Sequence, residues 1–220
     1  MSVGSHASLN LARHVGDDPQ AVEENRSRLS AQLAMPLVFV DQVHSAEVQV
    51  LPTKGEIPVV QADALVTDRS DLALAIMVAD CMPVLLSDAE AGVIGAAHAG
   101  RPGLLAGVLE ATVAAMQERG AAPERIEAAI GPSACGDCYE VPQEMAEDAA
   151  ALLPSVRSTT RWGTPAIDLR AGAVEALGRV GVRAQAIDRD HPCTIEDPTW
   201  FSFRRSRSTG RFAGVIARAD

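Results

Sequence analysis

Three short segments of this chain contain residue types that can bind a metal ion. They are Gln42-Val43-His44, residues 79–83 with Cys81 at their centre, and His98-Ala99-Gly100. Two imidazoles and one thiolate suit a borderline-soft ion such as Zn²⁺, and three protein ligands leave a fourth tetrahedral position open. A plainer interpretation is that Cys81 packs in an apolar run and the two histidines never meet. The pattern predicts an open, catalytic site if the fold brings the segments together.

Other polar residues near these segments are candidates for catalysis or substrate contact. Asp80 either orients a ligand imidazole as a catalytic residue or caps a turn. Asn10, His14 and Asp63 are candidate substrate contacts. His14 could equally be an exposed residue that flanks a helix or a proton donor, and Asp63 could instead anchor backbone amides.

A basic cluster near the end of the chain is the main source of local positive charge. It consists of Arg204, Arg205, Arg207 and Arg211 in a chain whose net charge is -10. Such a cluster either focuses an anion into a cleft or forms a solvated face. Arg204 and Arg205 are the candidates for clamping an anionic group through their forked donors.

The composition bounds the class of protein. The chain has 220 residues, of which 47% are hydrophobic and 3% aromatic, enough for one aliphatic core and a single domain, residues 1–220. Its negative charge argues against nucleic-acid and anionic-membrane partners. No apolar stretch approaches the roughly 18 residues of a membrane span, and the N-terminus lacks a signal-peptide pattern. We therefore expect a cytoplasmic protein; the sequence leaves its oligomeric state open.

The remaining cysteines show no disulfide framework. Cys135 and Cys138 form a lone CxxC, and Cys193 lies far along the chain. A closed zinc cage requires a second pair of ligands, and a redox dithiol is not favoured because a thioredoxin-like order of strand and helix is missing. We expect these thiols to be structural, with Cys138 available to line a pocket.

Hydrophobic periodicity and turn residues predict the elements that position the candidates. Asp17-Asp18-Pro19 is typical of a helix start, so a helix is expected over 19–33. His44 falls in the connection between two of the predicted strands, and His98 and Gly100 fall where a strand feeds a helix, a place that favours anions. Strands are expected over 37–40, 46–51, 62–67, 72–78, 83–87, 92–97, 126–130, 183–187 and 211–217, and further helices over 102–119, 142–153 and 168–180. This order favours an α+β or mixed α/β layered domain.

An ordered set of motifs covers almost the whole chain. Besides QVH at 42–44 and HAG at 98–100, the set contains SLNL at 8–11, HVGDD at 14–18, ADALVT at 62–67, ADCMPVLL at 79–86, IGP at 130–132, CYEV at 138–141, CT at 193–194, FSFRR at 201–205 and TGR at 209–211. This set resembles the YfiH-like laccase-domain family, historically labelled polyphenol oxidase and now interpreted as purine nucleoside phosphorylase.

The resemblance implies a zinc-dependent enzyme that phosphorolyses adenosine, inosine and methylthioadenosine and also deaminates adenosine. Its metal ligands fall on His44, Cys81 and His98. It also implies a layered α-β-β-α fold with mixed sheets, related to cytotoxic necrotizing factor and putative cysteine hydrolases. Family members usually carry an Arg and a Gly pair before the position of Ser2, which have no counterpart here. The common HAGWRG also differs, with Arg101 and Pro102 in place of Trp and Arg, so Arg101 is a candidate for holding phosphate.

Two alternatives stay open beside the phosphorylase. One is a cysteine hydrolase or amidase that edits peptidoglycan precursors, with Cys81 as the nucleophile activated by His44 or His98. The other is a zinc-stabilised binding module without turnover. A multicopper oxidase is excluded because five histidines are far too few for its copper centres, so copper is at most a secondary occupant.

Overall fold

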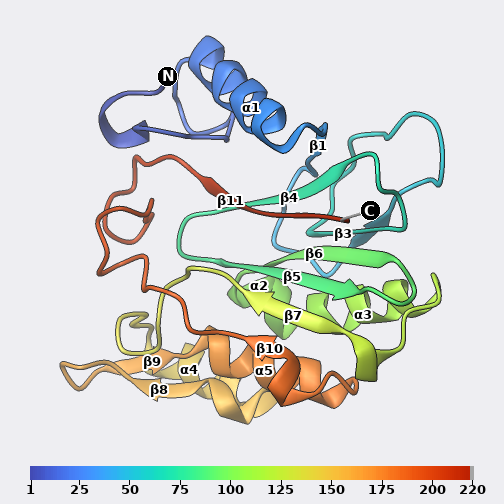
Figure 1. Ribbon diagram of the computed structural model, residues 1–220. Helices are drawn as coiled ribbons and strands as arrows, with labels where there is room; N and C mark the ends of the chain where they lie inside the picture. The colour runs from blue at the N-terminus through green and yellow to red at the C-terminus, as the bar shows by residue number, and fades with distance from the viewer. Residues whose placement is uncertain (219–220) are drawn as a thin grey trace.

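The computed structural model, which describes residues 1–218, has two β-sheets stacked between helical layers (Figure 1). Helix α1 (Pro19–Leu33) covers the outer face of one sheet, and helices α2 to α5 lie beyond the other. This arrangement is the mixed-sheet α-β-β-α architecture that the resemblance implies, so the predicted fold class is confirmed.

Helix α1 begins where the sequence predicts. The side chain of Asp18 caps it by accepting a hydrogen bond from the backbone N–H of Gln20, and Pro19 occupies the first helical position. The helix ends at Ala34, whose backbone is left-handed, with φ of 53°. Helix α1 lies above the sheet that contains β4, where its Leu29 packs on a small cluster with Met77.

The smaller of the stacked sheets has three strands. Its order is β1-β4-β11, with β1 parallel and β11 antiparallel to the central strand. The strands are β1 (Leu37–Val38), β4 (Ala73–Val78) and β11 (Phe212–Ala217). The last strand of the chain therefore pairs with a strand from its first half.

The larger sheet has six strands in the order β10-β7-β5-β6-β3-β2. They are β2 (Val48–Val50), β3 (Ala64–Thr67), β5 (Met82–Asp88), β6 (Val93–Ala99), β7 (Glu127–Ile130) and β10 (Ile187–Asp188). Strands β5 and β6 are antiparallel neighbours at its centre, and every residue of β6 is buried. Burial of both faces explains why β6 is a nearly continuous apolar run.

Two hydrophobic layers hold the stack together. Leu65, Leu74 and Ile76 belong to the cluster between the two sheets. Val84 and Leu109 belong to the larger cluster between the six-stranded sheet and its helices. Helices α4 (Gln143–Leu152) and α5 (Leu169–Arg179) lie where the sequence predicts helices, within a few residues.

Two local predictions differ from the structure, and one hairpin was not predicted. The helix expected over 102–119 is two helices, α2 (Arg101–Leu105) and α3 (Val108–Gln117), because Gly107 between them adopts a φ of 91°. The strand expected over 183–187 is mostly a 3₁₀ turn followed by the two residues of β10. The hairpin of β8 (Arg157–Thr159) and β9 (Pro165–Ile167) was not predicted, since each strand has only three residues.

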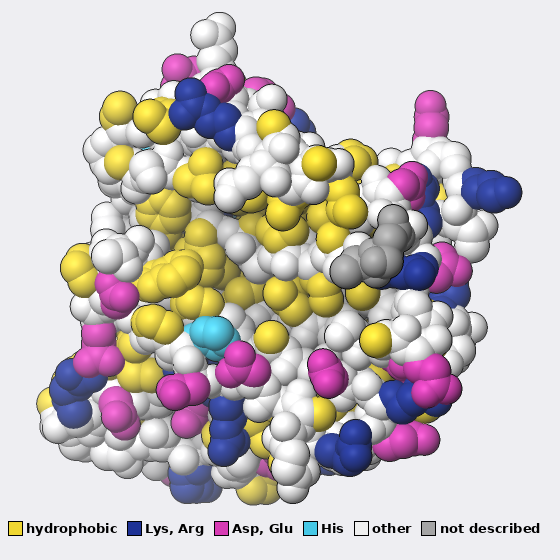
Figure 2. Space-filling model, in the orientation of Figure 1, with side chains coloured by type: hydrophobic (Ala, Val, Ile, Leu, Met, Phe, Trp, Pro, Cys, Tyr) yellow, Lys and Arg dark blue, Asp and Glu magenta, His cyan; other side chains and the backbone are white. Residues whose placement is uncertain are grey.

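Hydrophobic side chains gather across the middle of one face of the molecule, with charged side chains above and below them (Figure 2). Strand β11 contributes half-buried residues to the sheet beneath this region, including Phe212 and Ile216. Among residues 1–218, no helix combines the length and the apolar character that crossing a bilayer demands.

Candidate metal centre and substrate cavities

The fold brings His44, Cys81 and His98 together. His98 lies near the end of β6, Cys81 immediately precedes β5, and the register pairs His98 with Pro83 across these two strands. His44 reaches them from the connection between β1 and β2, so that its Nε2 is 3.8 Å from the Cys81 Sγ. One ligand atom from each residue lies within 4.8 Å of the others. Segments that are distant in sequence thus form one compact donor set.

Asp63 positions both histidines. Its carboxylate accepts hydrogen bonds from the backbone N–H groups of His44 at 2.9 Å and Ser45 at 2.6 Å, and it lies 2.7 Å from the His98 Nδ1. A bond from Nδ1–H to this carboxylate leaves the His98 Nε2 free to face the sulfur. Asp63 is fully buried, so the expected substrate contact is replaced by the alternative role of anchoring backbone amides.

One residue of the centre and one beside it have left-handed backbones. His44 has a φ of 62° and Asp80 a φ of 85°, conformations that cost roughly 1–3 kcal/mol each for residues other than glycine. The Asp80 carboxylate accepts hydrogen bonds from the Thr194 hydroxyl at 2.7 Å and the Arg204 backbone N–H at 2.6 Å. Asp80 therefore tethers two distant loops, which corrects the expectation that it orients an imidazole.

The donor set favours a thiolate. Burial by itself would raise the pKa of Cys81, but hydrogen bonds and charge from His44 and His98 outweigh it and lower that pKa to about 6. Burial would likewise lower the pKa of His98, whereas Asp63 and the thiolate raise it to about 9. Around neutral pH the sulfur is therefore in the form that binds metals.

Gly100 leaves the room that a bound ion needs. A Cβ atom at this position would lie 2.9 Å from the Cys81 Sγ and 2.9 Å from the His44 Cδ2. Together with a thiolate, two imidazoles and a His98 tautomer set by Asp63, this space makes the three residues a good fit for Zn²⁺.

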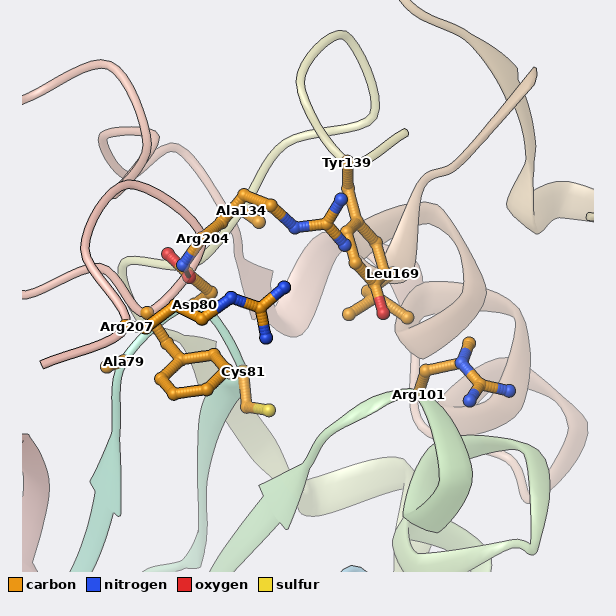
Figure 3. Close-up of a pocket in the computed structure, with 10 residues that line it drawn as sticks. Ala79, Asp80, Cys81, Arg101, Ala134, Tyr139, Leu169, Arg204 and Arg207 are labelled. Carbon is orange, nitrogen blue, oxygen red and sulfur yellow. Dashed lines mark hydrogen bonds between the residues drawn. The ribbon is translucent and has the colours of Figure 1, made fainter. Parts of the chain in front are cut away.

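A cavity of about 430 Å³ opens over Cys81 (Figure 3). Arg204 and Arg207 enter it from the C-terminal loop, while Tyr139, Leu169 and Arg101 lie across from them. Its lining residues are Ala79, Asp80, Cys81, Arg101, Ala134, Tyr139, Leu169, Phe203, Arg204 and Arg207. Aromatic and cationic side chains thus face one space.

A second cavity of about 270 Å³ adjoins the first. Both imidazoles of the donor set line it, together with His14 and Arg211. Cys81 and Phe203 line both cavities. The candidate metal centre therefore lies at the junction of two cavities.

The remaining predicted contacts divide into two groups. Arg101 and Arg204 line the larger cavity and His14 the smaller one. Asn10 is fully buried and binds neighbouring backbone and Asp17, and Arg205 donates to backbone carbonyls of its own loop. Both side chains hold the local backbone in place through these hydrogen bonds. Neither lines either of the two cavities, contrary to the expectation of substrate contact.

Sequence reasoning missed several lining residues. Phe203 and Tyr139 occur within the motifs FSFRR and CYEV, yet an isolated aromatic residue has no spacing signal that marks it as part of a pocket. The sequence marks Arg207 only as a member of the basic cluster, not as a residue of a cavity. Cys138 lines neither cavity; it is buried in a separate group of thiols, so the expectation that it lines the pocket is wrong.

Comparisons with known proteins agree with one another. A family described as "Multi-copper polyphenol oxidoreductase laccase" matches residues 1–219. A purine nucleoside phosphorylase of Streptomyces coelicolor is 48% identical over 98% of this chain and 90% of its own length. YlmD from Geobacillus stearothermophilus superposes with a TM-score of 0.91 at 34% identity, covering 100% of this chain and 88% of that one. For YfiH from Bacillus licheniformis the TM-score is 0.90 at 29% identity, with 99% and 88% coverage.

Proposed function

This chain belongs to the multi-copper polyphenol oxidoreductase laccase family, and from this premise we propose that it is a zinc-dependent purine nucleoside phosphorylase. Its substrates are inorganic phosphate and adenosine, inosine or methylthioadenosine. The observation that supports this most is the position of His44, Cys81 and His98 at the junction of two cavities. The name of the Streptomyces coelicolor relative supplies the substrate class.

The three donors would hold Zn²⁺, which when bound supplies Lewis-acid polarisation of an oxygen atom. The family description mentions copper, but only two of the five histidines belong to the donor set formed by residues 1–218. Copper therefore remains a secondary occupant in this proposal.

The larger cavity provides contacts for both substrates. Tyr139 and Phe203 offer aromatic faces for a purine ring. Arg204 and Arg207 offer guanidinium groups for phosphate, and Arg101 adds a third positive charge. A volume of about 430 Å³ lies within the usual range for small-molecule sites, about 300–1,000 Å³. These residues bind and orient phosphate and nucleoside so that the phosphate oxygen faces the anomeric carbon of the ribose.

His14 is the chain's candidate for moving a proton. It lines the smaller cavity beside His44 and His98. Burial, aided by the charge of Arg211, lowers the pKa of His14, so its imidazole is neutral around pH 7 and able to accept a proton. This residue supports the second proposed activity, adenosine deamination, in which a base relays protons between water and the purine.

The test is an assay of zinc-loaded protein with adenosine, in the presence and absence of phosphate. Phosphorolysis predicts adenine and ribose 1-phosphate only when phosphate is present, and deamination predicts inosine in either condition. If a fully metal-loaded sample forms none of these products, the proposed function is wrong.

Cys81→Ala should remove metal binding at the donor set and turnover together, because the thiolate is the one anionic ligand. We expect turnover to fall at least about 100-fold, measured alongside zinc content. Asp148→Asn, an exposed change in helix α4 away from both cavities, is the control. A Cys81→Ala protein with unchanged activity would contradict the proposal.

A cysteine hydrolase is the second candidate, and one arrangement favours it. Cys81, His98 and Asp63 form a chain of thiol, imidazole and carboxylate, with 2.7 Å between the last two groups. A nucleophilic role requires Cys81 to be free of metal. Iodoacetamide labelling distinguishes the candidates: the phosphorylase predicts that zinc protects Cys81 from alkylation, whereas the hydrolase predicts rapid alkylation and loss of amidase activity in the protein as purified.

A further inference from the structure

We infer that Cys135, Cys138, Cys193 and Glu196 form a second metal site, separate from the candidate centre, that takes a zinc-type divalent cation. One ligand atom from each of these residues lies within 4.8 Å of the others. The CxxC motif thus acquires the second pair that a closed zinc cage requires, and that pair is Cys-x-x-Glu. The site lies outside both cavities, and no step of the proposed reaction uses it.

The two ligand pairs occupy turns with the same backbone hydrogen bonds. The carbonyl of Cys135 accepts from the N–H groups of Cys138 at 3.0 Å and Tyr139 at 2.9 Å. In the same way, the carbonyl of Cys193 accepts from Glu196 at 3.2 Å and Asp197 at 2.9 Å. Each turn therefore supplies its first and fourth side chains to one centre, the usual manner in which CxxC turns bind zinc.

The rest of the fold holds these turns against each other. Ser133 and Cys193 form a parallel β-bridge, and the Thr194 N–H donates to the Ser133 carbonyl at 3.1 Å. The Arg170 guanidinium donates to the carbonyls of Ser133 at 2.9 Å and Pro192 at 2.7 Å. The protein therefore brings the four donors together by itself, without needing the ion to gather them.

The spacing and burial suit a tetrahedral ion. With Zn–S of about 2.3 Å and Zn–O of about 2.1 Å, donor atoms around zinc lie roughly 3.6–3.8 Å apart. The Cys135 Sγ and the Glu196 Oε2 are 3.8 Å apart. Cys138 and Cys193 are buried, and the four protein donors would complete the coordination. A closed set of this kind indicates a structural site, not a catalytic one.

Arg161 balances the charge of the donors. Three thiolates and a carboxylate outnumber the two positive charges of a divalent cation. The Arg161 guanidinium donates to the Cys138 Sγ at 3.0 Å and also pairs with the Glu196 carboxylate. Such hydrogen bonds to sulfur and carboxylate ligands orient them and offset their excess negative charge.

The site lies behind one wall of the larger cavity. Ala134 and Tyr139, on either side of the CxxC turn, line that cavity. Thr194, next to Cys193, binds the Asp80 carboxylate. An ion shared by the two turns would therefore fix the cavity wall and the loop that leads to Arg204, and its loss would loosen substrate binding.

Metal counting tests the site independently of activity. Protein saturated with Zn²⁺ and then desalted should contain two zinc ions per chain by elemental mass spectrometry. Cys81→Ser and the double variant Cys135→Ser/Cys193→Ser should each retain one, while Asp137→Asn, an exposed residue inside the CxxC turn, should retain two. A single zinc in the parent protein that disappears completely in Cys81→Ser would overturn the inference.

Cobalt gives a second measurement on folded protein if the double variant does not fold. Co²⁺-loaded Cys81→Ser should keep intense thiolate-to-cobalt absorption in the near ultraviolet, because three sulfurs remain at the second site. Absence of that absorption would overturn the inference. So would a thiol titration of the denatured parent protein showing that two of the three cysteines are joined in a disulfide.

Discussion

A single buried carboxylate connects the two histidines of the candidate centre. The Asp63 carboxylate accepts a hydrogen bond from the backbone N–H of His44 and is within hydrogen-bond distance of the Nδ1 of His98. His44 needs this support because its left-handed backbone is unfavourable. The separation between the two imidazoles therefore depends on one residue that contacts neither cavity.

Gly100 is a residue where a single added methyl group should disturb the candidate centre directly. In Gly100→Ala, the new methyl group would collide with the Cys81 Sγ and the His44 Cδ2, each 2.9 Å from the added atom. We expect a loss of about 10- to 100-fold in zinc affinity at the donor set, measured by competition with a chelating dye.

Gly178→Ala in helix α5 is the matched control. Apart from its chain neighbours and the backbone of its own helix, no atom of residues 1–218 lies within 4 Å of a Cβ built at Gly178, so the methyl group meets no other part of the described protein. Zinc affinity should stay unchanged, and helix propensity should raise the free energy of unfolding by up to about 1 kcal/mol. Equal zinc affinity in the two variants would show that Gly100 does not crowd the centre.

At the scale of elements, the central pair β5 and β6 places both Cys81 and His98. The turn that joins these strands begins at Asp88, the last residue of β5. Its buried carboxylate accepts the N–H groups of Ala91 at 3.1 Å and Ala122 at 2.8 Å, and pairs with Arg125 at 2.8 Å. Asp88 therefore ties the turn to the segment after helix α3.

Asp88 should give the protein an acid-sensitive part of its stability. Burial would raise the pKa of Asp88, but Arg125 and the backbone N–H donors outweigh it and lower that pKa to about 2. Because the folded-state pKa lies below the unfolded value of about 3.9, this stabilisation is present above pH 4 and disappears as the pH falls toward 2. Arg125 is partly exposed, so we expect about 1–2 kcal/mol.

Urea unfolding between pH 7 and pH 2.5 would measure this contribution. Asp88→Asn should be less stable than the parent at pH 7, with the difference shrinking at the acid end. Asp148→Asn, an exposed change in helix α4, should follow the parent at every pH. A constant difference for Asp88→Asn across this range would exclude the ionised carboxylate as its cause.

At the scale of the whole molecule, positive charge is concentrated where the proposed substrate binds. The chain has a net charge of -10, yet Arg101, Arg204 and Arg207 all line the larger cavity. A local basic site in an acidic protein draws anions to one place while the rest of the surface repels them.

Phosphate binding should therefore depend on salt and on Arg207. Raising the salt concentration to 0.5 M should increase the KM for phosphate several-fold, because the distance over which exposed charges interact is only about 10 Å at 0.1 M and shortens further as salt rises. Arg207→Gln should raise the same KM and weaken its salt dependence. Arg157→Gln, an exposed arginine on β8, is the control. Identical KM values for all three proteins at low salt would contradict a role for Arg207.

Much of the fold followed from local patterns. The cap at Asp18, the proline after it and the apolar alternation of the later strands predicted helix α1 and the central strands within a few residues, because capping and periodicity act over one or two turns. The break at Gly107 was not predicted, since glycine signals a possible left-handed residue without showing that the chain adopts it there.

The sequence by itself singled out His44, Cys81 and His98 through their ligand chemistry and motif order. Only the tertiary structure decided that these residues meet, that Asp63 positions two of them, and that Cys193 and Glu196 complete the CxxC group. The reason is physical: residue chemistry is encoded one position at a time, whereas proximity across more than fifty residues depends on how the sheets pair and pack.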